Sequence, residues 1–225
     1  MTQDRWPRLA FGVALVVTVI VVGVLAVILA RGSNDEPVAS TSGECESVDA
    51  PEPRDPGSNE APTAPLEDGK TYALTFDTNC GSFTVTLDNE LAPNTAASLV
   101  ALAQDGYFDD TIFHRVVPNF VIQGGDPMQS GLGGPGYSTV DVPPSDGAYT
   151  KGTVAMAKSE VEAPGTSGSQ FFVVTANDAG LKPEYAIVGT VTAGIDTIDR
   201  IGALAVADGP PSQPVVISSV TVTES

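Results

Sequence analysis

The 225-residue chain has little of the material from which most catalytic and metal sites are built. It contains one histidine, His114, and two cysteines, Cys45 and Cys80. A single histidine excludes a two-histidine metal site within the chain, and the two cysteines lack the spacing of a zinc site. No H-E-x-x-H, G-x-S-x-G or P-loop pattern occurs. The sequence therefore gives weak support to covalent or metal chemistry, and we expect no cofactor.

Basic residues are also scarce. Ten Lys and Arg residues stand against 28 Asp and Glu residues, which gives a net charge of -18. Because phosphate binding needs clustered Lys and Arg, we expect no nucleic-acid partner. The acidic residues are spread along the chain, so they indicate a solubility feature rather than a site for cationic partners.

One long apolar run, residues 9–30, contains no charged residue. As a helix, its 22 residues would span about 33 Å, the thickness of a hydrocarbon core. A cleaved signal peptide is the alternative, but its apolar region is only about 7–15 residues long, whereas this run continues to Arg31. Arg5 and Arg8 precede the run, which favours a cytoplasmic N-terminus, residues 1–8. We therefore predict a single-pass anchor in the cell membrane, with the rest of the chain outside the cytoplasm.

Residues 31–70 are predicted to form a disordered, acidic, proline-rich linker. Residues 32–70 hold six prolines, ten acidic residues and very few large apolar side chains. Such a segment cannot bury enough surface to offset the entropy lost on ordering. Cys45 lies in this linker, and Cys80 lies in the turn of the first predicted hairpin. Outside the cytoplasm they can form a disulfide that fastens the linker to the domain; two unpaired thiols are the alternative.

The folded domain is predicted to span residues 71–225. Its strands are expected where β-branched and aromatic residues alternate with polar ones or form short apolar runs. The predicted strands are Tyr72–Phe76, Phe83–Leu87, Phe113–Gln123, Thr153–Ala157, Phe171–Thr175, Ala186–Val191 and Val215–Thr223. One helix is predicted from Pro93 to about Gly106 and a second over Ile195–Ile201. Many strands, two short helices and glycine-rich connections favour a mainly β domain, with a barrel preferred over a sandwich.

The stretch Phe113–Pro127, F-H-R-V-V-P-N-F-V-I-Q-G-G-D-P, sets one arginine and one glutamine into an apolar run. An arginine in such a segment either snorkels from a core strand or serves as a fixed cation in a hydrophobic groove. A second segment, G-S-Q-F-F-V at residues 168–173, follows later in the chain. The two segments together favour the groove.

With these segments in this order, the sequence resembles the cyclophilin family of peptidyl-prolyl cis/trans isomerases over about residues 71–225. The resemblance implies a closed eight-stranded antiparallel β-barrel capped by two α-helices, here preceded by one transmembrane helix. It also implies an enzyme that rotates X-Pro bonds in proline-containing polypeptides, without a covalent intermediate or a cofactor. Combined with the anchor at residues 9–30, it predicts a bacterial, membrane-anchored isomerase that assists folding of exported or cell-envelope proteins. We expect a monomer.

The resemblance also implies roles for individual residues. Arg115 matches the catalytic arginine, Gln123 the glutamine that orients it, and Phe120 one face of the pocket for the proline ring. The residues expected to line the rest of the substrate groove are Phe172, Leu181, Tyr185, Gln170, Ala157, Val121 and Lys158. Val121 and Lys158 stand where the family often has Met and Asn. His114, which precedes the arginine, is expected to point away from the groove.

A binding module or chaperone for proline-containing peptides, with incidental catalysis, is the alternative. A binder needs only the apolar pocket, whereas Arg115 and Gln123 beside Phe120 favour an enzyme. Twisting an X-Pro bond localises a lone pair on the proline nitrogen, against a barrier of about 18–20 kcal/mol. A guanidinium at that nitrogen binds the twisted form better than the planar one, which lowers the barrier.

Overall fold

The computed structural model describes residues 43–225. The predicted cytoplasmic N-terminus (residues 1–8) and membrane span (residues 9–30) therefore lie outside the described residues, and so does the first part of the predicted linker. Within residues 43–225, no helix is both long and apolar enough to cross a bilayer.

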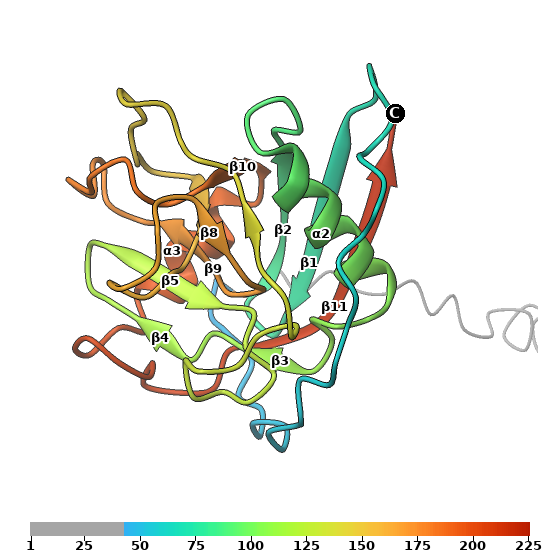
Figure 1. Cartoon of the computed structure of the whole chain (residues 1–225). Helices are drawn as coiled ribbons and strands as arrows, with labels where there is room; N and C mark the ends of the chain where they lie inside the picture. The colour runs from blue at the N-terminus through green and yellow to red at the C-terminus, as the bar shows by residue number, and fades with distance from the viewer. Residues whose placement is uncertain (1–42) are drawn as a thin grey trace, which may run out of the picture. The chain divides into compact units, whose positions relative to one another are not determined.

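The described chain is built mainly from strands, with two helices, as the sequence predicts (Figure 1). The strands are β1 (Tyr72–Thr78), β2 (Gly81–Leu87), β3 (Thr111–Ile112), β4 (Arg115–Val116), β5 (Val121–Gly124), β6 (Thr139–Val140), β7 (Thr153–Met156), β8 (Thr166–Ser167), β9 (Phe171–Val174), β10 (Ile187–Ala193) and β11 (Val216–Glu224). The helices are α2 (Pro93–Gln104) and α3 (Ile195–Gly202). Both predicted helices are confirmed, and so is every predicted strand except Phe113–Gln123.

Nine strands form one antiparallel sheet in the order β3-β11-β1-β2-β10-β7-β9-β5-β4, and β6 and β8 form a separate pair. The predicted mainly β fold is therefore confirmed, but its principal sheet has nine strands rather than the predicted eight. Its end strands, β3 and β4, are separated in the chain only by Phe113 and His114. In the described part of the chain, no strand pairing joins β3 to β4; β3 pairs with β11, and β4 pairs with β5.

The predicted strand 113–123 is two short strands joined by a turn, and the prediction of a continuous strand was wrong. Pro118 has no N–H to donate to a ladder, and Asn119 adopts a left-handed backbone with φ of 50°. The turn folds β5 back on β4, so that Arg115 lies directly opposite Gln123. The break in the strand thus places the two most important predicted residues side by side.

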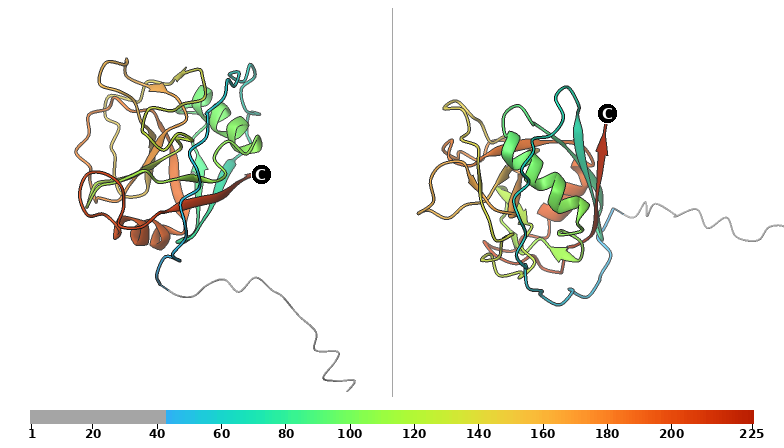
Figure 2. Two further views of the ribbon diagram at one scale, coloured as in Figure 1. Left: turned by 90° about the horizontal axis from the view of Figure 1, so that it is seen from below. Right: turned by 45° about the vertical axis from the view of Figure 1, so that its right-hand side comes forward.

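The main apolar core is rich in aromatic rings. Phe76 and Phe83 stack with their ring centroids 4.8 Å apart, and Phe113 meets Phe171 edge to face at 6.0 Å. Such pairs stabilise a fold beyond their burial of apolar area. Of the two helices, α2 packs on β11 and β1, whereas α3 packs on β2 and β5. Figure 2 shows them at separate places around the sheet.

The N-terminus of α2 is held by a side chain from a distant loop. Ala92 precedes the helix and offers no capping side chain, and the first turn contains no acidic residue. Asp141, which is buried, supplies the missing acceptor. Its Oδ2 accepts hydrogen bonds from the Thr95 backbone N–H at 2.7 Å and hydroxyl at 2.6 Å, and its Oδ1 accepts one from Asn94 Nδ2 at 2.8 Å.

Asp141→Ala is expected to lower the free energy of unfolding by about 2 kcal/mol, because a buried cap of a helix N-terminus is lost. Urea denaturation of the full chain, followed by near-ultraviolet circular dichroism, measures this loss. Asp146→Ala is the matched control at an exposed position, and we expect its effect to stay within about 0.5 kcal/mol. Equal unfolding free energies for the two variants would contradict the capping role.

Residues 43–70 form no helix or strand, but they contact the folded domain, which differs from the disordered linker expected from composition. A disulfide joins Cys45 to Cys80 in the turn between β1 and β2. Next to it, the Glu46 N–H donates to the Asn79 carbonyl at 2.8 Å. The pairing of the two cysteines, which the sequence left open, is thus present in the structure.

Beyond the disulfide, residues 45–59, here named the strap, run along the outside of the domain (blue to teal in Figures 1 and 2). The Arg54 backbone N–H donates to the Pro127 carbonyl at 3.0 Å, and its guanidinium donates to the carbonyl of Tyr107. The Asn59 N–H donates to the Pro135 carbonyl at 3.0 Å. Composition could not predict this because hydrogen bonds and one disulfide, rather than buried apolar side chains, hold the strap.

Candidate active site

A pocket of about 180 Å³ brings together nine of the ten predicted site residues. They come from β4, β5 and β9, from the turn before β5, and from the loops that follow β7 and β9. The lining residues are Arg115, Phe120, Val121, Gln123, Ala157, Lys158, Phe172, Leu181 and Tyr185. The fold therefore gathers residues that lie between positions 115 and 185 of the sequence.

The apolar part of the pocket is built on Phe172, which is buried. The Tyr185 ring meets Phe172 edge to face, with the centroids 5.6 Å apart. Tyr149 lies behind both and is only 1% exposed. Its hydroxyl donates to the Tyr185 carbonyl at 2.7 Å and accepts from the Tyr185 N–H at 3.0 Å. Tyr149 thus fixes the backbone that carries Tyr185, a role that no sequence motif indicated.

The polar edge of the pocket is a chain of hydrogen bonds that begins at Arg115. Arg115 Nη1 donates to Gln123 Oε1 at 3.1 Å, and Gln123 Nε2 donates to Gln170 Oε1 at 3.1 Å. Gln170 Nε2 in turn donates to the Gly133 carbonyl at 2.9 Å. Because each amide both accepts and donates, the chain fixes the orientation of Gln123 toward the guanidinium. The structure thus places Gln123 in direct hydrogen-bonding contact with Arg115.

Arg115 has a second partner that the sequence analysis missed. Its Nε donates to Asp208 Oδ1 at 2.6 Å, and its Nη2 donates to Asp208 Oδ2 at 3.0 Å. This hydrogen bonding holds the pKa of the Asp208 carboxyl below its ordinary value. Asp208 lies in the loop after α3, 93 positions from Arg115, and no pattern in that loop marks it.

His114 does not line the pocket described above, in agreement with the sequence-based expectation. Neither ring nitrogen has a hydrogen-bond partner among the residues that the structure describes. Burial lowers the pKa of the imidazole below its ordinary value. The geometry therefore assigns His114 no acid or base role at the pocket.

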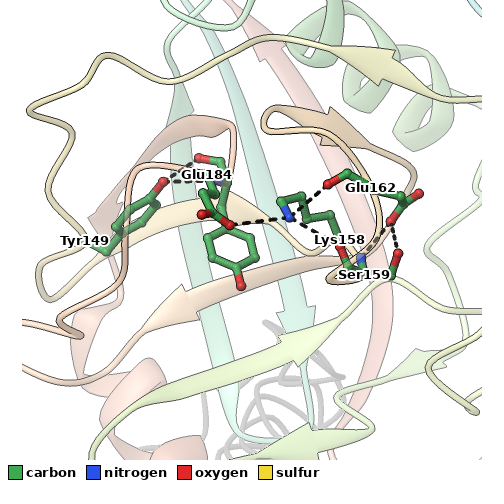
Figure 3. Close-up of polar contacts among 6 residues, drawn as sticks. Tyr149, Lys158, Ser159, Glu162 and Glu184 are labelled. Carbon is green, nitrogen blue, oxygen red and sulfur yellow. Dashed lines mark hydrogen bonds and ion pairs between the residues drawn. The ribbon is translucent and has the colours of Figure 1, made fainter.

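Lys158 lines the pocket with its stem, but its ammonium is occupied by the protein itself (Figure 3). The side chain is only 3% exposed. Its Nζ donates to the carbonyls of Ser159 and Glu162, both at 3.2 Å, and lies 3.7 Å from Glu184 Oε2. The Glu162 carboxylate accepts from the Ser159 N–H at 2.6 Å, which lowers the pKa of Glu162. Lys158 thus holds together the loop of residues 158–162, which lies next to the pocket.

A larger groove of about 680 Å³ adjoins the pocket and shares Gln123, Ala157 and Lys158 with it. Gln170, the tenth predicted site residue, lines this groove rather than the pocket. The groove is also lined by Pro56 and Gly57 of the strap. Sequence reasoning missed these strap residues because it placed them in a disordered linker.

Tyr149→Phe is expected to raise the Kd of a short Ala-Pro peptide about threefold and to lower the free energy of unfolding by about 1–2 kcal/mol. The Tyr185 N–H and carbonyl lose their partner, so the loop that carries the Tyr185 ring loosens. Titration followed by NMR measures the Kd. Tyr72→Phe is the control, since the Tyr72 hydroxyl accepts from Glu67 in a different region, and we expect an unchanged Kd. A wild-type Kd for Tyr149→Phe would contradict this role.

The described residues define a mainly β protein with an apolar pocket beside a fixed arginine, and three comparisons place it in a family. The family model for "Cyclophilin type peptidyl-prolyl cis-trans isomerase/CLD" matches residues 73–222. The chain belongs to this family, and its activity is the cis-trans isomerisation of X-Pro peptide bonds.

Relatives occur in fungi and in bacteria. The chain is 44% identical over 133 residues to "Peptidyl-prolyl cis-trans isomerase-like 1" of Emericella nidulans, covering 57% of this chain and 80% of the relative. It is 37% identical over 185 residues to "Probable peptidyl-prolyl cis-trans isomerase B" of Mycobacterium leprae, covering 73% of this chain and 60% of the relative.

The fold also matches a solved structure, a cyclophilin-type peptidyl-prolyl cis-trans isomerase of Cryptosporidium parvum. The TM-score is 0.62 at 28% identity, covering 68% of this chain and 98% of the other. The same protein was solved in the presence of the dipeptide Ala-Pro, with a TM-score of 0.62 at 29% identity.

Proposed function

We propose that Arg115 is the catalytic residue, with Gln123 orienting it and Phe120 forming part of the pocket for the proline ring. The observation that carries this proposal is the position of the guanidinium. Arg115 lines the apolar pocket and donates to Gln123 at its edge, so a cation with fixed orientation lies next to a space suited to a small apolar ring.

The reaction needs only a group that prefers the twisted amide. In the planar X-Pro bond the nitrogen lone pair is delocalised, and it becomes a hydrogen-bond acceptor only when the bond rotates. A donor already oriented toward that nitrogen binds the transition state better than either ground state. The buried Phe172 side chain gives the pocket an apolar floor, beside which such an interaction is stronger than in water. No bond is broken, so the step requires no nucleophile.

The substrates we propose are proline-containing polypeptides, with Phe172, Leu181, Tyr185 and Val121 around the proline ring. Ala157, Lys158 and Gln170 would contact the chain that precedes the proline. The structure of the Cryptosporidium relative that was solved in the presence of the dipeptide Ala-Pro supports this substrate class. Lysine at position 158 contributes through its stem, because its ammonium is committed to backbone carbonyls.

We further propose a bacterial enzyme that acts as a monomer outside the cytoplasm, anchored by residues 9–30, on exported or cell-envelope proteins. One observation supports the location and another supports the bacterial origin. The Cys45–Cys80 disulfide is typical of an oxidising compartment. The match to the mycobacterial relative extends over more of this chain than the match to the fungal one. Uncatalysed isomerisation takes tens to hundreds of seconds, slow enough to delay the folding of such clients.

For the domain, residues 71–225, we propose that the nine-stranded sheet closes as a barrel. The end strands β3 and β4 are two residues apart in the chain. In addition, the Val116 N–H of β4 donates to the Gly209 carbonyl at 2.8 Å, which ties β4 to the segment leading into β11.

An exchange experiment by NMR tests the proposed function. The full chain in detergent micelles is mixed with a short Ala-Pro-containing peptide, and the interconversion of cis and trans resonances is measured. We expect interconversion within about a second instead of the tens of seconds or more of the free peptide. Peptide binding without acceleration would favour the alternative, a binding module or chaperone. Absence of both binding and acceleration would overturn the proposal.

A further inference from the structure

We infer that Asp208 is a positioning residue for the isomerisation, because its carboxylate holds the Arg115 guanidinium in the orientation that faces the pocket. The inference rests on the proposed role of Arg115. It concerns a residue in a loop far from the two sequence segments on which the site was predicted.

The first support is the bidentate geometry. Both carboxylate oxygens of Asp208 accept from one edge of the guanidinium, Nε at 2.6 Å and Nη2 at 3.0 Å. Gln123 Oε1 accepts a hydrogen bond from one N–H of Nη1. An arginine has five N–H donors in a rigid plane, so three are occupied and one remains on each terminal nitrogen. Two planar partners therefore fix the plane, and the free donors are those available to a substrate.

The second support is that Asp208 is itself held in place by the backbone next to it. The Val116 N–H donates to the Gly209 carbonyl at 2.8 Å, so the residues that follow Arg115 and Asp208 are paired as well. Gly209 has φ of 152°, a conformation that favours glycine. The loop is also closed by a hydrogen bond from the Ser212 N–H to the Leu204 carbonyl at 2.9 Å. The carboxylate is thus presented to Arg115 by an anchored loop.

The third support is the exposure of both partners. The Arg115 side chain is 33% exposed and that of Asp208 is 63% exposed. An ion pair this exposed contributes little to fold stability. A partly exposed arginine without the pair would sample many rotamers, and ordering it during the reaction would oppose catalysis. The carboxylate also weakens the positive potential at Arg115, but the high effective dielectric at this exposure keeps that effect small. Orientation is therefore its main contribution.

Steady-state kinetics of the full chain test the inference. Asp208→Ala is expected to lower kcat about three- to tenfold while KM stays within about twofold, since the oriented guanidinium matters most in the twisted state. Asp208→Asn is expected to lower kcat by the same factor, because its side-chain NH₂ group would face one of the two Arg115 donors, Nε or Nη2. Asp208→Glu, which restores both acceptors, is expected to recover most of the rate.

Asp196→Ala is the matched control. Asp196 accepts from Arg200 Nη1 at 2.7 Å, is 72% exposed and lies on α3 outside the pocket, so its removal changes the net charge equally. We expect wild-type kinetics for this variant. The Nε–H resonance of Arg115 supplies a second readout: it should exchange slowly with water in the wild type and in Asp208→Glu, and rapidly in Asp208→Ala.

Three results would overturn the inference. The first is a wild-type kcat for Asp208→Ala together with a lowered kcat for Arg115→Ala. This result would leave the proposed function intact. The second is a loss of kcat accompanied by a loss of the near-ultraviolet circular dichroism of the fold, because Asp208 would then be structural. The third is a wild-type protein that does not accelerate isomerisation, which removes the proposed function as well.

Discussion

Arg115→Ala is expected to lower kcat/KM for X-Pro isomerisation by about 10²- to 10³-fold, the usual cost of removing one oriented donor to a developing charge. The guanidinium lines the pocket and is held by Gln123 and Asp208, so it needs little reorganisation when the amide twists. A protease-coupled assay or exchange NMR on a short X-Pro peptide measures the change.

Arg115→Lys is the control that separates geometry from charge. Lysine keeps the positive charge but lacks the planar fork, so it cannot bond to Asp208 and Gln123 while donating to the proline nitrogen. We expect it to recover only a small part of the lost rate. Full recovery would contradict the account, because charge alone would then be sufficient.

Cys45→Ala is expected to lower the free energy of unfolding by about 3–4 kcal/mol. The disulfide closes a loop with a sequence separation of 35, and removing it restores conformational freedom to the unfolded chain. Urea denaturation of the full chain followed by near-ultraviolet circular dichroism measures the loss.

A reducing agent provides the matched control for that variant. Added to the wild type, it should produce the same destabilisation as Cys45→Ala, and added to the variant it should have no further effect. Equal stability of the oxidised wild type and the variant would mean that the strap is held by its hydrogen bonds alone, contrary to this prediction.

The sequence predicted the parts of the site that lie in continuous segments. The stretch Phe113–Pro127 carries Arg115, Phe120 and Gln123, and the segment at residues 168–173 carries Gln170 and Phe172. The helices and most strands were also predictable, because apolar periodicity and the proline and glycine boundaries mark them. Apolar periodicity and boundary residues involve only residues that are close in the sequence, so helices and strands can be predicted from them without the tertiary structure.

What the sequence did not predict depends on contacts between distant segments. Asp208 lies in a loop without a motif, and only the pairing of Val116 with Gly209 brings it to Arg115. Composition indicated a disordered linker where the strap lies, because a few polar contacts and one disulfide leave no apolar pattern. The strand 113–123 was predicted as continuous, since its apolar content outweighed the signal of Pro118.

The central claim is that Arg115 binds the twisted amide more strongly than the planar one. Measuring the Kd of an X-Pro peptide and its cis-trans exchange rate in the bound complex, for the wild type and Arg115→Ala, tests it most directly. We predict a Kd within about threefold of the wild type and an exchange rate at least about 100-fold lower. An Arg115→Ala variant whose affinity for the peptide falls by as large a factor as its exchange rate would contradict the claim. Arg115 would then stabilise the bound planar amide as much as the twisted one.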